Sequence, residues 1–337
     1  MTRNRRRSVA ALLAVSVAVV AAVSAGPGAA ASKSSKSTTL SLVAYSTPKI
    51  PFGQLISGFQ KTPAGADVKF TQSYGASTDQ ARAIVQGLPT DVVQLSLAAD
   101  IQLLVDAKLV SKNWNRTKYN GMVTNSLVTF LVRKGNPKNI HTWDDLLKPG
   151  IGIVQPNPVS SGGARWDVMA AYGQALAQKK TPKQAQAYLQ KYYKNIVSQD
   201  KSGRDALNTF LSGKGDVLIG YESEALPAIA AGNPVELIRP SYTLEIQNPI
   251  AVSGASSNPT QAKAFVQYLL TPAAQTIWAQ DGYRPVDPTV FAKFKKSFPT
   301  PHGVFKITDF GLGGWSAVTP KFFDPTNGIV TKIASGV

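Results

Sequence analysis

The chain has 337 residues, of which 43% are hydrophobic, and its formal net charge is +17. This length allows two domains of ordinary size, each with its own core, and the hydrophobic fraction excludes a largely disordered chain. Because the chain has no cysteine, disulfides, a thiolate nucleophile, a cysteine-bearing zinc site and a lipid anchor on cysteine are all excluded.

The N-terminal segment predicts export. Four arginines within the first seven residues precede an apolar run from Val9 to Val23 and the small residues Ala29 to Ala31. This pattern is typical of a secretory signal peptide, residues 1–31, and the arginines also resemble a twin-arginine signal. An uncleaved membrane anchor is the alternative. Residues 32–39 are rich in serine, lysine and threonine and predict a flexible linker.

Removal of the four signal arginines leaves a net charge of +13, which raises the possibility of nucleic-acid binding. The lysines and arginines are scattered, without a long basic run, so the sequence favours no nucleic-acid partner. A basic exported protein instead attracts anionic ligands and an anionic cell envelope.

Strand-like and helical segments alternate along the chain, which predicts an α/β fold with mostly parallel sheets covered by helices. The expected strands are 40–44, 67–72, 91–97, 125–133, 151–154, 216–220, 235–238 and 249–252. The long strand from Asn125 leaves a first lobe, and the strand from Pro249 returns to it. We therefore expect lobe I to comprise 40–124 plus 249–337, lobe II to comprise 125–248, and the ligand to lie in the cleft between them.

Four loops share one form, in which a strand end is followed by small or hydroxyl residues and then by a helix start. They are Tyr45 to Thr47, Gly75 to Thr78, Ser160 to Gly163, and Ser202 to Gly203. Such loops converge at the carboxyl edge of parallel strands, where free backbone N–H groups of helix starts hold anions. A cage of N–H donors suits a fully ionised tetrahedral oxyanion.

Enzyme signatures are weak in this sequence. An exported hydrolase would use Ser77 or Ser161 as nucleophile, but only His141 and His302 are present to serve as a base. We expect no catalysis, no cofactor and no metal site.

Several segments carry a resemblance to a known family. They are Phe130–Lys138, Ile140 and His141 with Trp143 and Leu146, Lys148–Gly150, Asn157 and Pro158, Ser160–Trp166, Asn208–Phe210, Gly215–Ile219, Glu222 with Glu224–Leu226, Tyr283–Pro285 and Gly313–Trp315. With them the chain resembles the periplasmic sulfate-binding proteins, the solute receptors of ATP-driven sulfate and thiosulfate importers. The resemblance implies a type II two-lobed periplasmic-binding-protein fold and a monomer. It also implies a location in the periplasm or outside the cell envelope, and hinge closure followed by delivery to ABC permease subunits.

The resemblance also implies the residues that bind the oxyanion. Carried over by position, they are Ser46, Ser77, Ser161, Gly162, Gly163, Gly203 and Tyr221. Three of these positions depart from the family pattern, because Gly203 replaces an alanine, Ser46 an aspartate and Tyr221 a tryptophan. A phenol can donate or accept a hydrogen bond, whereas an indole only donates.

The choice of anion therefore stays open in the sequence. Ser77 and Tyr221 are similar to positions of molybdate-binding receptors, so molybdate or tungstate is the alternative to sulfate and thiosulfate. Asp79 would accept a proton from an anion such as hydrogen phosphate if it faced inward. In the first helical turn, however, we expect it to face solvent.

Overall fold

The computed structural model describes residues 37–335. The expected signal peptide, residues 1–31, therefore lies outside the described residues. Most of the expected linker lies outside them too, and its last two residues belong to the first strand, which begins at Thr38. Within the described part of the chain, no helix is long and apolar enough to cross a membrane.

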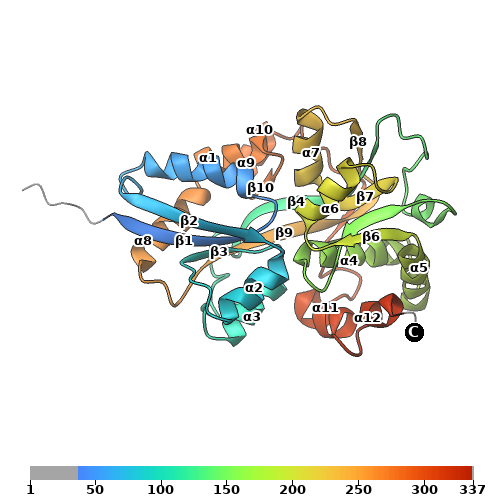
Figure 1. Ribbon diagram of the computed structural model, residues 1–337, viewed down its shortest axis with the longest axis horizontal. Helices are drawn as coiled ribbons and strands as arrows, with labels where there is room; N and C mark the ends of the chain where they lie inside the picture. The colour runs from blue at the N-terminus through green and yellow to red at the C-terminus, as the bar shows by residue number, and fades with distance from the viewer. Residues whose placement is uncertain (1–36, 336–337) are drawn as a thin grey trace, which may run out of the picture. The chain divides into compact units, whose positions relative to one another are not determined.

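Strands and helices alternate over most of the described chain (Figure 1). The strands are β1 (Thr38–Tyr45), β2 (Val68–Gly75), β3 (Val92–Gln94), β4 (Met122–Arg133), β5 (Ile153–Pro156), β6 (Ile196–Asp200), β7 (Val217–Tyr221), β8 (Val235–Ile238), β9 (Tyr242–Val252), β10 (Arg284–Pro285) and β11 (Gly303–Phe305). The helices are α1 (Lys49–Gln60), α2 (Ser77–Val85), α3 (Ala98–Asp106), the 3₁₀ turn η1 (Asp144–Leu147), α4 (Gly162–Ala177), α5 (Pro182–Lys194), α6 (Gly203–Leu211), α7 (Glu222–Ala230), α8 (Pro259–Leu269), α9 (Pro272–Gln280), α10 (Pro288–Lys293), α11 (Gly314–Phe323) and α12 (Ile329–Ala334).

The strands follow one another in the order β2-β1-β3-β9-β4-β7-β5-β6. Pairing is parallel among β1, β2 and β3, here called the first strand group, and among β5, β6 and β7, the second strand group. The prediction of mostly parallel sheets is correct for these two groups. It is wrong for β4 and β9, which run antiparallel to each other and to the neighbouring strands β3 and β7.

Helices cover both faces of the first strand group, as the buried side chains of β1 require. Successive residues point to opposite faces, so Leu42 packs with Phe52 of α1 while Val43 packs with Ile84 of α2 and Ile101 of α3. Figure 1 shows α1 and α9 on one side of these strands and α2 with α3 on the other.

The long strands β4 and β9 connect the two strand groups. One end of β9 pairs with β3 at Val92, its middle pairs with β4, and the other end of β4 pairs with β7 at Tyr221. Only two strands therefore carry the sheet from one group to the other. Helix α12, which belongs to the expected lobe I, packs against α5 of the expected lobe II, and the division into lobes stays a prediction.

Strands β6, β10 and β11 were not among the expected strands, and β9 is longer than expected. The prediction missed β6 because its sequence, Ile196 to Asp200, has only two apolar residues. It lies at the edge of the sheet with half-buried and exposed residues in alternation, which weakens any hydrophobic signal. Strand β9 begins at Tyr242, seven residues before the expected start at Pro249, in a stretch that contains Glu245, Gln247 and Asn248.

The start of α7 is fixed by a buried ion pair. Glu222, its first residue, is fully buried, and its carboxylate accepts hydrogen bonds from Arg239 at 2.5 Å and from Arg284 at 2.6 Å. Arg239 directly follows β8 and Arg284 lies in β10. The pair therefore ties the residue after Tyr221 to two other strands.

We expect Glu222→Gln to lower the free energy of unfolding by about 3–5 kcal/mol, because it leaves the buried Arg284 guanidinium without its counter-charge. Urea denaturation followed by tryptophan fluorescence measures this loss. The matched control is Asp144→Asn, which removes an exposed partner of Lys180 and should cost less than about 1 kcal/mol. Equal losses of unfolding free energy in the two variants would contradict the stabilising role of the buried Glu222 ion pair.

Candidate functional site

One cavity lies where strand ends and helix starts of both strand groups meet. Its lining residues are Tyr45, Ser46, Thr47, Ser77, Ser96, Thr129, Leu131, Pro156, Ser161, Gly163, Asp167, Gly203, Leu218, Ile219, Gly220, Tyr221, Glu224 and Ala225. Measured as the space open to the centre of a water molecule, its volume is about 20 Å³. About 10–15 Å³ by this measure holds one water molecule, so the cavity has room for a small ion.

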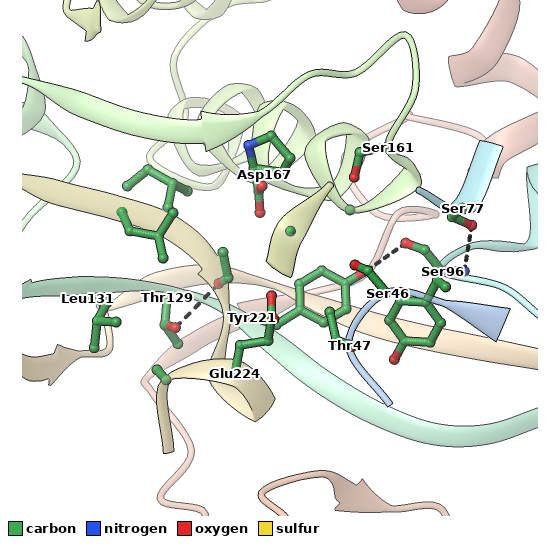
Figure 2. Close-up of a pocket in the computed structure, with 18 residues that line it drawn as sticks. Ser46, Thr47, Ser77, Ser96, Thr129, Leu131, Ser161, Asp167, Tyr221 and Glu224 are labelled. Carbon is green, nitrogen blue, oxygen red and sulfur yellow. Dashed lines mark hydrogen bonds between the residues drawn. The ribbon is translucent and has the colours of Figure 1, made fainter. Parts of the chain in front are cut away.

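Most of the predicted site residues come together at this cavity. Those that line it are Ser46, Ser77, Ser161, Gly163, Gly203 and Tyr221. Figure 2 shows the labelled serines and Tyr221 around the same space. Gly162 does not line the cavity and lies beside it, against Leu97 and Asp100.

The Ser77 hydroxyl is engaged within the protein. It donates to the Asp100 carboxylate at 2.6 Å and accepts from the backbone N–H of Ser96 at 2.8 Å. Asp100 also accepts from Thr78 at 2.9 Å and lies 4.0 Å from the Arg165 guanidinium. Burial raises the pKa of Asp100, while Arg165 and the two hydroxyl donors oppose this shift. Ser77 thus positions the loop after β3.

The start of α2 contacts the loop before α4 directly. The backbone N–H groups of Thr78 and Asp79 donate to the Ser160 carbonyl at 3.1 and 3.3 Å. These two donors of the α2 start are therefore used by protein, and α2 contributes Ser77 to the cavity lining.

Ser96 joins the two strand groups through several bonds. Its hydroxyl lies 2.6 Å from the Tyr221 hydroxyl, and its carbonyl accepts from the Trp166 indole at 2.9 Å and the Asn248 amide at 2.9 Å. Burial raises the pKa of Tyr221 well above its ordinary value, so the phenol stays protonated. The sequence interpretation missed Ser96, because it lies at the end of a predicted strand without a glycine or a cap motif.

The start of α4 borders the cavity through Ser161 and Gly163. Ser161 caps the helix by accepting from the backbone N–H of Ala164 at 3.4 Å. Gly162 and Gly163 are the first two residues of α4, where backbone N–H groups have no partner in a preceding turn. Gly163 lies against Ser161 and the Tyr221 ring, so a larger residue would fill part of the cavity.

The start of α6 approaches the first loop of the chain. The backbone N–H of Arg204 donates to the Ser46 hydroxyl at 3.4 Å, and its guanidinium donates to the Thr47 carbonyl at 3.3 Å. A Cβ atom at Gly203 would lie 2.8 Å from a carboxylate oxygen of Glu224. The missing side chain at Gly203 therefore makes room for Glu224.

Two buried carboxyl groups line the cavity, and the sequence interpretation missed both. Asp167 is fully buried, and neither of its side-chain oxygens has a hydrogen-bond partner among residues 37–335. Glu224 lies 3.2 Å from the Arg204 guanidinium. Burial raises the pKa of both carboxyl groups; nearby Glu224 raises that of Asp167 further, whereas Arg204 lowers that of Glu224.

Neither Asp79 nor the histidines face the cavity. Asp79 pairs with Arg82 at 3.2 Å and lies 3.6 Å from the Lys201 ammonium, outside the cavity lining. His141 and His302 are also outside the lining. A hydrolase that used Ser77 or Ser161 would therefore find no histidine base in this cavity. In the described chain, no three His, Asp or Glu side chains are grouped as metal ligands.

This mixed sheet, with helix starts around one small cavity, is the fold of the type II solute-binding proteins. Comparison with known structures agrees. The chain is similar to the sulfate-binding protein SubI from Mycobacterium tuberculosis H37Rv, with a TM-score of 0.82 and 41% sequence identity. The match covers 85% of this chain and 100% of that chain.

The chain belongs to the bacterial extracellular solute-binding protein family, whose profile matches residues 40–284. It is 37% identical to the sulfate-binding protein of Synechococcus elongatus over 96% of this chain and 94% of that protein. It is 34% identical to the thiosulfate-binding protein of Escherichia coli K12, over 89% of this chain and 93% of that protein.

We expect Gly162→Ala to destabilise the protein by about 1–3 kcal/mol, because the new Cβ would lie 2.2 Å from Leu97 and 2.6 Å from Asp100. The urea midpoint measures the effect. Gly53→Ala is the control, since a Cβ there meets nothing within 4 Å, and removal of a helical glycine should stabilise by up to about 1 kcal/mol. An unchanged midpoint for Gly162→Ala would contradict the close packing.

Proposed function

We propose that this chain is an exported receptor that binds sulfate in the cavity and delivers it to the permease of an ATP-driven importer. The observation that carries the proposal is the meeting of the α4 and α6 starts at one small cavity. Its lining, drawn from residues 37–335, contains no lysine or arginine. Relatives named as sulfate-binding and thiosulfate-binding proteins support this ligand class.

The chemistry of the lining suits a fully ionised oxyanion. Sulfate accepts hydrogen bonds at all four oxygens, and helix starts offer both N–H donors and the positive end of a dipole. We assign Ser161, Gly162, Gly163 and Gly203, at the starts of α4 and α6, as donors to the ligand. Ser46, after β1, and Ser77, at the start of α2, border the ligand on another side. Tyr221, at the end of β7, forms part of the cavity wall.

Molybdate or tungstate is the second candidate, and Tyr221 is the observation that favours it. A phenol at this position resembles the molybdate-binding receptors more than the sulfate-binding ones. The Tyr221 hydroxyl, however, lies 2.6 Å from the Ser96 hydroxyl, so it has less capacity to form a hydrogen bond with a ligand. We therefore keep sulfate, with thiosulfate as a related ligand, as the first choice.

Location and partners follow from the same proposal. Family members are extracellular solute-binding proteins. We infer that this chain is exported to the periplasm or the exterior of the cell envelope and that it acts as a monomer. Its macromolecular partners would be the permease subunits of an ABC importer.

Calorimetry with sulfate, thiosulfate, molybdate and phosphate tests the ligand. We expect sulfate to bind most tightly, and Ser161→Ala to weaken it by about 10- to 100-fold, the value of a hydrogen bond to a charged group. Ser57→Ala is the matched control, because that hydroxyl donates only to the Gly53 carbonyl on the exposed side of α1. Molybdate binding without sulfate binding would overturn the first choice.

The Trp166 indole offers a test of hinge closure, because it donates from α4 to the Ser96 carbonyl in the segment after β3. We expect sulfate to reduce the radius of gyration in small-angle scattering, and Trp166→Phe to weaken sulfate about 3- to 10-fold by removing one bond of the closed form. The control is Trp143→Phe, whose indole donates to the Tyr242 carbonyl at 2.7 Å, away from the cavity. No compaction on adding sulfate would contradict hinge closure.

A further inference from the structure

The cavity contains a carboxyl group that the binding of a dianion does not explain. Asp167 lies on α4, about one turn after the first residues of this helix, Gly162 and Gly163. Its side chain is fully buried, lines the cavity, and has neither oxygen hydrogen-bonded within residues 37–335. Figure 2 shows Asp167 and Ser161 directed toward the same space.

A negative charge on Asp167 would oppose both the fold and the ligand. Removal of a carboxylate from water without a partner costs several kcal/mol, and a dianion beside it would add Coulomb repulsion. No lysine, arginine or histidine of the described chain forms an ion pair with Asp167. The neutral acid avoids both penalties and adds one hydrogen-bond donor.

The neighbours of Asp167 act in the same direction. The titratable groups that face it are Glu224 from α7, Tyr221 at the end of β7, and Tyr192 and Tyr193 from α5. Glu224 lies 3.2 Å from the Arg204 guanidinium, which opposes the rise that burial causes in the pKa of Glu224. None of these four groups is a cation that could stabilise an ionised Asp167, and Glu224 raises the pKa of Asp167 further, which favours its protonated form.

We infer that Asp167 is protonated in the ligand complex and donates its carboxyl hydrogen to an oxygen of the bound dianion. The inference rests on the proposed function and refines it, because it identifies a specificity-determining residue and a pH dependence. The proton stays on Asp167, and no covalent bond forms or breaks. The site then binds a dianion together with one proton.

The sign of the pH dependence follows from this coupling. A dianion raises the pKa of Asp167 above the value that burial already gives it. Sulfate affinity should be constant below the pKa of Asp167 in the free protein. Above that pKa it should fall by up to about tenfold per pH unit, since each binding event takes one proton from solvent.

Calorimetry with sulfate across pH 6 to 9.5, in buffers of different ionisation enthalpy, measures affinity and proton uptake. We expect the wild-type affinity to fall at high pH, whereas Asp167→Asn keeps the low-pH affinity at every pH because its amide donates without titrating. The control is Asp106→Asn, on the exposed side of α3, which should keep the wild-type profile. The same decline in Asp167→Asn as in wild type would overturn the inference.

If the sulfate affinity of the wild type does not change with pH, infrared difference spectroscopy tests directly whether Asp167 is protonated. The sulfate complex should then show the carbonyl stretch of a protonated carboxylic acid, sensitive to D₂O and absent from Asp167→Asn. Absence of that band overturns the inference, and so does tight binding of hydrogen phosphate without sulfate, which requires an ionised acceptor. If sulfate binds the wild type at no pH, the proposed function itself fails, which is a separate result.

Discussion

The short segment after β3 carries the hydrogen bonds on which both strand groups depend. Ser96 donates its backbone N–H to Ser77, accepts at its carbonyl from Trp166 and Asn248, and bonds through its hydroxyl to Tyr221. Because Ser96 is fully buried, loss of any of these partners would leave a buried polar group unsatisfied, at about 1–3 kcal/mol. The wall of the cavity is therefore fixed by bonds among protein groups, and the ligand adds to a frame that already exists.

The two arginines nearest this network, Arg165 and Arg204, have partners within the protein. Arg165 approaches the buried Asp100 and donates to the Pro158 carbonyl, while Arg204 pairs with Glu224. Both cations near the cavity thus neutralise carboxylates of the protein. A ligand in the cavity meets backbone dipoles and neutral donors instead of a full cation, and it needs no counter-ion of its own. The lysines and arginines of residues 37–335 lie outside the cavity lining, where salt screens their charge.

Much of this arrangement could be predicted from the sequence, because helix starts after strands have a local signature. Ser161 with Gly162 and Gly163 is visible as a cap followed by residues without side chains. Asp167 has no such signature, since nearly all of α4 is buried and its polar and apolar residues show no single exposed face. Ser96 and Glu224 become significant only through partners far away in sequence. Strand β6 was missed because the sequence of this edge strand, Ile196 to Asp200, does not alternate between apolar and polar residues.

From the sequence, the phenol of Tyr221 was expected to influence which anion binds. In the structure its hydroxyl bonds to Ser96, so other groups of the cavity have more influence on the choice of anion. The Tyr221 hydroxyl is committed to Ser96, so its capacity to donate or accept is largely spent within the protein. Selectivity then depends on other groups of the cavity lining, among them Gly163 at the start of α4 and the carboxyl group of Asp167, whose oxygens have no hydrogen-bond partner within residues 37–335. A neutral acid among donors rejects an anion that carries its own proton, because two hydrogens would meet without an acceptor between them. Protonation of one buried carboxyl group therefore gives the same preference for a proton-free oxyanion that a second backbone donor would give.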